Sequence, residues 1–170
     1  MKKLLAISLF TLTLSFQSLV SGEFDTYTFL MKSIEDKKSS AEVKRIISEG
    51  ADVNAIHSEY LRCAKPVLRY ALDRGSDAES IEIINTLIKF GAKVNEVTYN
   101  RVSKKQFYGF MPLLTYAAIY SSAEIVQILI NAGAKDTVLE GSDLIFKKTA
   151  LQIAQELGRT DVVNVLKNLQ

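Results

Sequence analysis

Apolar residues recur along this chain three and four positions apart, in stretches that resemble one another. The stretches cover residues 43–47, 83–88, 125–130 and, in a shorter form, 162–166. This spacing gathers apolar side chains into one stripe, which is typical of an amphipathic helix. Gly50, Gly91 and Gly133 follow the first three stretches, at the point where a residue in the left-handed conformation often ends a helix.

A second apolar stretch precedes each of the last three. These shorter stretches cover residues 65–71, 111–118 and 149–154. Pro66 and Pro112 stand near the expected first turn, where a helical amide has no intrahelical partner in any case. The small residues Ala71, Ala117 and Ala154 allow neighbouring helices to approach closely. We therefore predict helix pairs that stack to form one continuous core, since a single pair has too little apolar surface to fold alone.

Polar residues mark the expected starts of the longer helices. In a capping box, a Ser or Thr hydroxyl accepts a hydrogen bond from a backbone amide, and a Glu three residues later accepts one in return. Three pairs have this spacing, namely Ser39 with Glu42, Ser76 with Glu79, and Ser121 with Glu124.

The combination of these features resembles the ankyrin repeat, which opens with T-P-L-H-x-A and ends with G-A-D-V-N. Residues 50–54 read GADVN, residues 91–95 read GAKVN and residues 133–136 read GAKD. The resemblance covers nearly all of residues 23–170. It implies an all-α fold, an ankyrin-repeat solenoid of about four helix-loop-helix units with extended hairpin-like fingers between repeats. The repeats are expected at about 24–55, 65–96, 111–137 and 148–170.

The spacing of the repeats departs from the family period of about 33 residues. Gly50 and Gly91 are 41 residues apart, and Gly91 and Gly133 are 42 apart. One insertion is predicted near residues 75–79, between paired helices, and the rest between repeats, with the longest finger at 94–111. Insertions in repeat proteins map to loops on one face, which is often the binding face.

The predicted fingers are rich in aromatic and basic residues, the types that anchor protein interfaces. Phe110 adds a further aromatic residue to the middle finger. The alternative is a hairpin whose alternation satisfies strand pairing, with some of the aromatic residues in the core. The candidate contacts are His57, Glu59, Tyr60 and Arg62 in the first finger, Tyr99, Arg101, Lys104, Lys105, Phe107 and Tyr108 in the middle finger, and Phe146 and Lys147 in the third.

The family resemblance implies a second set of contacts, because ankyrin repeats usually bind partners with the finger tips and the concave face of the first helices. The positions that match this face are Asp73, Arg74, Ile119 and Tyr120. The predicted insertion after Gly75 makes the match weaker for the first two.

The N-terminus has the layout of a secretory signal peptide. Lys2 and Lys3 are followed by a short apolar run and then by small residues that permit cleavage near Gly22. The alternative is an uncleaved anchor, but polar Ser and Thr residues interrupt a run shorter than the roughly 20 residues that a span needs. We expect residues 1–22 to be removed and the remainder to be periplasmic or secreted, without membrane insertion.

Charge and composition narrow the function classes. Loss of the two leader lysines reduces the 21 basic residues to 19, which equals the number of acidic residues. A nucleic-acid-binding protein normally has a basic excess, so nucleic acid is an unfavoured partner. His57 and Cys63 are the only histidine and cysteine. They are too few for a zinc site, and no motif of an enzyme or cofactor site is found, so we expect no catalysis, metal or cofactor.

The functional hypothesis is an exported module, monomeric alone, that binds and modulates another exported protein. An inhibitor or immunity partner of a periplasmic hydrolase is the leading form of this hypothesis. The alternatives are a protective chaperone of a periplasmic enzyme such as a catalase, and a secreted effector that acts in a host cell.

Overall fold

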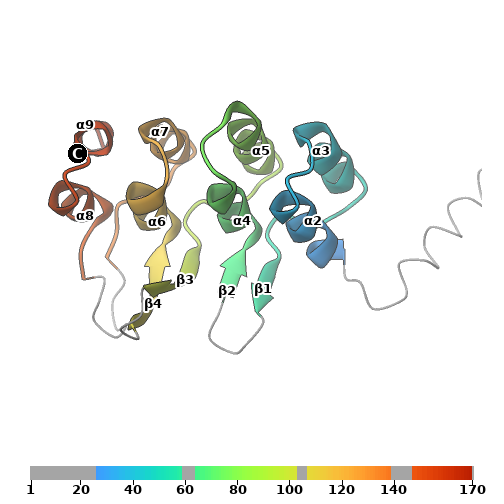
Figure 1. Ribbon diagram of the computed structural model, residues 1–170, viewed down its shortest axis with the longest axis horizontal. Helices are drawn as coiled ribbons and strands as arrows, with labels where there is room; N and C mark the ends of the chain where they lie inside the picture. Colours follow the sequence, from blue (N-terminus) through green and yellow to red (C-terminus); the bar gives the residue numbers. More distant parts are fainter. Residues whose placement is uncertain (1–25, 59–63, 103–106, 139–146, 170) are drawn as a thin grey trace, which may run out of the picture.

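The computed structural model describes residues 26–58, 64–102, 107–138 and 147–169 (Figure 1). Within these ranges the chain forms eight helices and two separate two-stranded hairpins. The described part is mostly helical, which is consistent with the predicted all-α class. The predicted leader, residues 1–22, lies outside the described residues.

The helices form four successive pairs. The pairs are α2 (Thr26–Glu35) with α3 (Ser40–Ser48), α4 (Val67–Arg74) with α5 (Ala78–Lys89), α6 (Leu113–Tyr120) with α7 (Ala123–Asn131), and α8 (Ala150–Glu156) with α9 (Thr160–Lys167). Figure 1 shows α2, α4, α6 and α8 side by side, which we call the inner row. The outer row consists of α3, α5, α7 and α9. Successive pairs therefore stack along one axis, as the sequence predicted.

Aliphatic side chains fill the space between the two rows. Leu68 of α4 and Leu114 of α6 are buried in the inner row, and Ile84, Leu87 and Ile125 are buried in the outer row. They belong to a single cluster that extends from Leu30 to Leu166. The periodic apolar stripes of the sequence thus form one shared core, whose burial is the main favourable term in folding.

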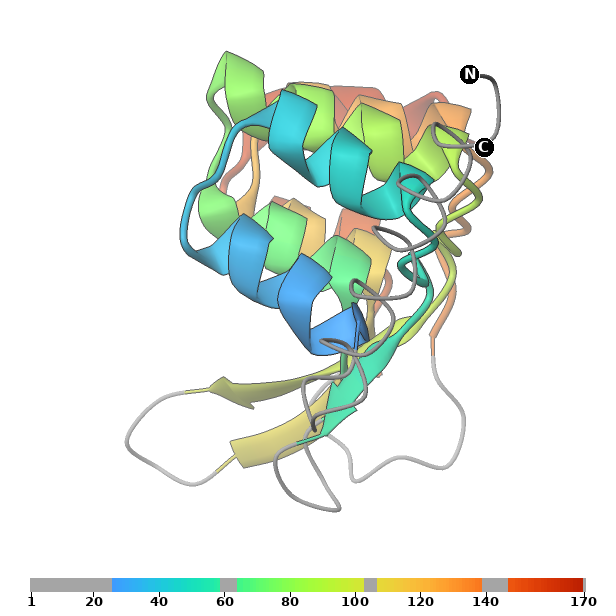
Figure 2. The same cartoon turned by 90° about the vertical axis from the view of Figure 1, so that its right-hand side faces the viewer.

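Two antiparallel hairpins connect consecutive pairs. The strand β1 (Ile56–Ser58) pairs with β2 (Ala64–Pro66), and β3 (Val97–Val102) pairs with β4 (Phe107–Pro112). Figure 2 shows that both hairpins project from the side of the inner row, away from the helices. Pro66 and Pro112 each end a strand and occupy the N-cap position of the next inner helix. The first two predicted fingers are thus hairpins, and the tip of the third lies in residues 139–146, outside the described ranges.

Two of the three predicted helix caps differ by one residue from those in the structure. Ser39 caps α3 and accepts a hydrogen bond from the amide of Glu42 at 3.2 Å. The caps of α5 and α7 are Asp77 and Ser122, one residue after the predicted Ser76 and Ser121. Ser121 instead ends α6, so only the following serine is left to begin the next helix.

The predicted glycine ends are confirmed. Gly91 and Gly133 both have φ of 90°, in the left-handed region that side chains other than glycine rarely adopt. At Gly91 this geometry brings the amide of Ala92 to the carbonyl of Leu87 at 2.9 Å, which closes the last turn of α5. No heavy atom lies within 4 Å of an added Cβ at either glycine, so the backbone angle alone requires glycine.

Two asparagines link successive repeats along one edge of the stack. The side chain of Asn54 donates to the carbonyl of Gly91 at 3.0 Å and accepts from the amide of Lys93 at 2.8 Å. Asn95 makes the same two hydrogen bonds to Gly133 and Lys135, with the same two distances. Each repeat is therefore aligned with the next by a two-bond amide bridge.

The opposite edge of the stack carries different links. Arg74 donates to the carbonyl of Lys38 at 2.7 Å, and the Ser122 amide donates to the hydroxyl of Ser76 at 3.2 Å. Arg159 donates to the carbonyls of Ala118 and Ser121 at 2.9 and 2.5 Å. Hydrogen bonds thus fix the loops between paired helices as well as the post-glycine loops.

The insertion predicted near residues 75–79 is mostly helical. The connection between α4 and α5 is only one residue longer than that between α6 and α7. The rest of the difference is in α5, which has 12 residues where α7 has nine. The added residues are absorbed by nearly one further turn of helix, because Ala78 and Glu79 continue the helical pattern instead of forming a loop.

Among the described residues, no helix is long and apolar enough to cross a membrane.

Candidate functional site

Five polar and aromatic residues meet on the inner row where α4, α6 and the two hairpins adjoin. We call Lys65, Arg69, Asp73, Thr98 and Tyr116 the Asp73 cluster. The Asp73 carboxylate lies 2.8 Å from the Lys65 ammonium and accepts from Arg69 Nε at 2.8 Å and from the Tyr116 hydroxyl at 2.7 Å. One carboxylate therefore connects β2, α4 and α6.

Arg69 is the most buried member of this cluster that carries a charge, with 9% of its side chain exposed. Its guanidinium carbon lies 3.2 Å from the centre of the Tyr116 ring, and Nη1 donates to the Thr98 hydroxyl at 3.2 Å. A stacked guanidinium with a carboxylate partner is satisfied both electrostatically and by packing. Arg69 thus ties α4 to both α6 and β3.

The first hairpin joins the same surface through Tyr70 of α4. The Lys65 ammonium lies 3.8 Å from the centre of the Tyr70 ring, and His57 Nδ1 lies 2.9 Å from the Tyr70 hydroxyl. The only histidine of the chain is therefore part of a hydrogen-bonded aromatic contact. No group of three or more potential metal-ligating residues is present in the described ranges.

The electrostatic state of the cluster follows from these contacts. Burial disfavours the ionised form of Asp73, but hydrogen bonds from Lys65, Arg69 and Tyr116 outweigh it and hold the pKa below its ordinary value of 3.8. Burial, followed by the hydrogen bond to Asp73, raises the pKa of Tyr116 well above its ordinary value. Near neutral pH the cluster contains a carboxylate, two cations and a neutral phenol.

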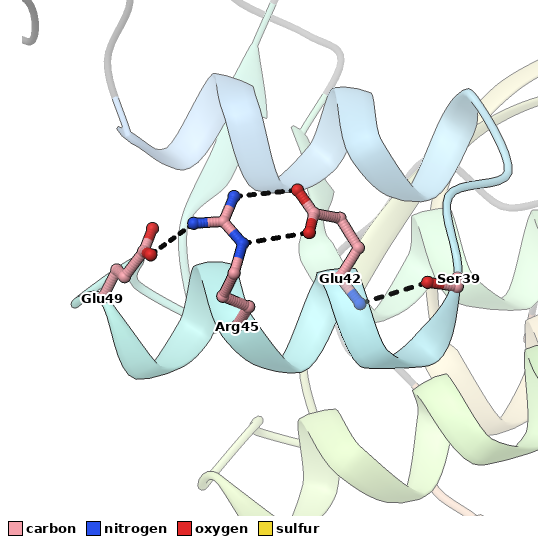
Figure 3. A network of polar contacts seen from close by, with 4 residues as sticks. All are labelled: Ser39, Glu42, Arg45 and Glu49. Atoms are coloured by element: carbon pink, nitrogen blue, oxygen red, sulfur yellow. Dashed lines mark hydrogen bonds and ion pairs between the residues drawn. The ribbon is translucent and has the colours of Figure 1, made fainter.

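A second polar network, on the outer helix α3, provides a contrast (Figure 3). Arg45 lies between Glu42 and Glu49 and forms ion pairs with both. Glu42 is the residue whose amide is capped by Ser39. Nearly half of the Arg45 side chain is exposed, and every partner belongs to α3 or its caps. This network therefore connects no two elements, unlike the Asp73 cluster.

The four predicted concave-face residues occupy different environments. Asp73 is the centre of the cluster, and Tyr120 is 52% exposed beside Tyr116, with ring centres 4.6 Å apart. Ile119 is half-buried against the core. Arg74 is half-buried and bonded to the α2–α3 loop, so its guanidinium already has a structural partner.

The hairpin residues are described mainly by their register. In the second hairpin Tyr99 pairs with Phe110, Arg101 with Tyr108, and Phe107 with Val102. Phe110 is 39% exposed, whereas Thr98 and Met111, which form the neighbouring pair, are fully buried. The hairpin is thus half covered by the helices at its base. Ile56 of the first hairpin is 47% exposed.

The third predicted finger is described only at its two ends. Lys147, in the third predicted finger, is exposed. The remaining predicted contacts lie outside the described residues and are Glu59, Tyr60, Arg62, Lys104, Lys105 and Phe146.

Sequence reasoning missed four members of the cluster as site residues, namely Lys65, Arg69, Thr98 and Tyr116. The signal for Arg69 was available, because Arg69 and Asp73 are four residues apart on a predicted helix and opposite charges at that spacing pair. Lys65 and Tyr116 join Asp73 only through the stacking of repeats, which no local spacing reveals.

The sequence matches no protein-family model. It also matches none of the curated proteins with which it was compared.

Proposed function

We propose that this chain is an exported ankyrin-repeat protein that binds and modulates a partner protein. The binding surface is the inner row at α4 and α6 together with the two hairpins. The proposal combines the predicted leader and the repeat resemblance of the sequence with the arrangement of stacked helix pairs and projecting hairpins.

The observation that carries the proposal is the ordered polar cluster together with exposed aromatic residues on α6 and β4. Asp73 receives contacts from Lys65, Arg69 and Tyr116, so these side chains are held before a partner arrives. Two exposed aromatic residues belong to elements of this surface, Tyr120 to α6 and Phe110 to β4. Binding to an ordered surface loses less conformational entropy, and aromatic and arginine residues dominate interface energies.

The modulation that we propose is inhibition, as in an immunity partner of a periplasmic hydrolase. A scaffold that covers its partner's surface acts by occlusion. The purified protein should therefore lower the activity of the captured partner. Preserved or increased activity would instead favour the protective role, and recovery of the chain from culture supernatant would favour an effector.

The test is affinity capture from periplasmic extract followed by mass spectrometry. The wild-type protein should retain one dominant partner. A variant with alanine at Tyr120 and Phe110, and a second with alanine at Tyr99, Arg101, Phe107 and Tyr108, should both lose it. The matched control is Phe90→Ala, because Phe90 is 42% exposed but lies at the end of outer helix α5. Capture that survives both multiple variants, with circular dichroism unchanged, contradicts the proposed surface.

A further inference from the structure

Charge is distributed unevenly across the two central repeats. The inner helices α4 and α6 and the four strands contain four basic residues, Lys65, Arg69, Arg74 and Arg101, and one acidic residue, Asp73. The outer helices α5 and α7 contain three acidic residues, Glu79, Glu82 and Glu124, and one basic residue, Lys89. Arg74 is bonded to the α2–α3 loop, so Lys65 and Arg69 are the basic residues that the described contacts place on the inner surface.

Within the Asp73 cluster the positive charge is only partly compensated. Asp73 supplies one negative charge to two cations, Lys65 and Arg69. The Arg69 guanidinium is nearly buried, whereas 30% of the Lys65 side chain is exposed. An ammonium has three hydrogen-bond donors, and Asp73 needs one of them. Lys65 is therefore the cation through which the excess charge is accessible from outside.

Asp73 also fixes where that cation is. Its carboxylate holds the Lys65 ammonium at 2.8 Å, over the Tyr70 ring. The ring and the carboxylate limit the rotamers of a side chain that is otherwise flexible. The position at which a second carboxylate would meet the ammonium is thus defined before binding.

We propose that the partner presents an acidic protein segment to this inner surface, with one of its carboxylates bound at Lys65. The inference rests on the proposed function and names the chemistry of the partner. Complementary charge both accelerates association and selects among partners. A protein segment fits better than a nucleic acid, because its apolar side chains can contact Ile56 and Phe110, which are exposed on the two hairpins of this surface.

The inference is tested with a fluorescein-labelled peptide in which Glu alternates with Leu, and with its Gln counterpart. Binding to the purified protein is measured by fluorescence anisotropy. The Glu peptide should bind and the Gln peptide should bind much more weakly. Lys65→Gln should weaken binding of the Glu peptide about fivefold, the effect of one partly exposed ion pair. Lys44→Gln removes the same charge from an exposed site on α3 and should have little effect.

Substitution of Asp73 should change the affinity for the Glu peptide in the opposite direction. Asp73→Asn removes the anion that competes for Lys65 but keeps a side-chain oxygen that can accept from its ammonium, so binding of the Glu peptide should become about threefold tighter. Glu124→Gln changes the net charge by the same amount at an exposed position of α7, so it is the matched control. Melting curves of all variants establish that each is folded.

Three results would overturn the inference. The first is equal weakening by Lys65→Gln and Lys44→Gln, and the second is equal binding of the Glu and Gln peptides. The third is tighter, Lys65-dependent binding of labelled single-stranded DNA. A captured native partner that Lys65→Gln retains fully would refute the acidic partner and leave protein binding intact. Failure of the wild type to capture any partner would instead count against the proposed function.

Discussion

The side chains packed between the helix rows and those on the surface of the inner row are held by different forces. Aliphatic residues such as Ile84, Leu87 and Leu114 fill the interior, where attraction has no direction and scales with buried area. The Asp73 cluster instead uses directed contacts between four elements, and its charges lose part of their hydration when they pair. The interior should therefore determine whether the protein folds, and the cluster should determine which surface it presents.

The largest effect is expected when the interior is opened at the end of the stack. A chain truncated after Arg159 loses α9, in which Val162 and Leu166 are buried. Two aliphatic side chains of this kind contribute about 3–6 kcal/mol together. Urea unfolding should show a loss of that size. A chain that ends after Lys167 keeps the helix and is the control, and equal unfolding midpoints would contradict a shared interior.

A smaller loss is expected when one polar link between repeats is removed. Asn95→Ala deletes the hydrogen bonds to Gly133 and Lys135, which should lower the free energy of unfolding by about 1–2 kcal/mol. Asn85 is exposed on α5 and provides the control, because Asn85→Ala removes an amide without a repeat contact among the described residues. If both variants unfold alike, the bridge does not align the repeats.

The smallest of the three effects is expected in the cluster, and it depends on pH. Because the pKa of Asp73 is lowered on folding, its ionised form stabilises the protein above the ordinary value of 3.8, and this stabilisation is lost as pH falls through the lowered pKa. Asp73→Asn should lower the free energy of unfolding by about 1 kcal/mol at neutral pH, after allowance for screening. The difference from wild type should shrink as the pH falls below 3.8.

The network on α3 is the control for this last prediction. Arg45→Gln also breaks two ion pairs, but they are exposed and confined to one helix (Figure 3). Thermal unfolding should resolve no change. A difference between wild type and Asp73→Asn that is the same at every pH would assign the effect to packing rather than to charge.

The repeating helices were predictable because their signals are local. Apolar spacing fixed the buried faces of α5 and α7, and Gly91 and Gly133 marked their ends. The caps were misplaced by one residue at Ser76 and Ser121 because each is followed by another capping residue. A sequence does not show which of two adjacent polar residues still belongs to the preceding turn.

The contacts between repeats were not predictable to the same degree. Asn54 and Asn95 stood out as parts of a repeated ending, but their roles require carbonyls 37 and 38 residues away. Tyr116 reaches Asp73 across 43 residues. Such pairs depend on how closely the helices stack, and that distance is set by the whole core.

The amide bridges have a consequence for how the chain can change in length. Asn54 joins the first repeat to the second through the same two bonds with which Asn95 joins the second to the third. If residues 55–95 were duplicated in tandem, each copy could form the same asparagine bridge to the repeat on either side. The number of hairpins offered to a partner can thus grow by copying one module, with no new coupling to evolve.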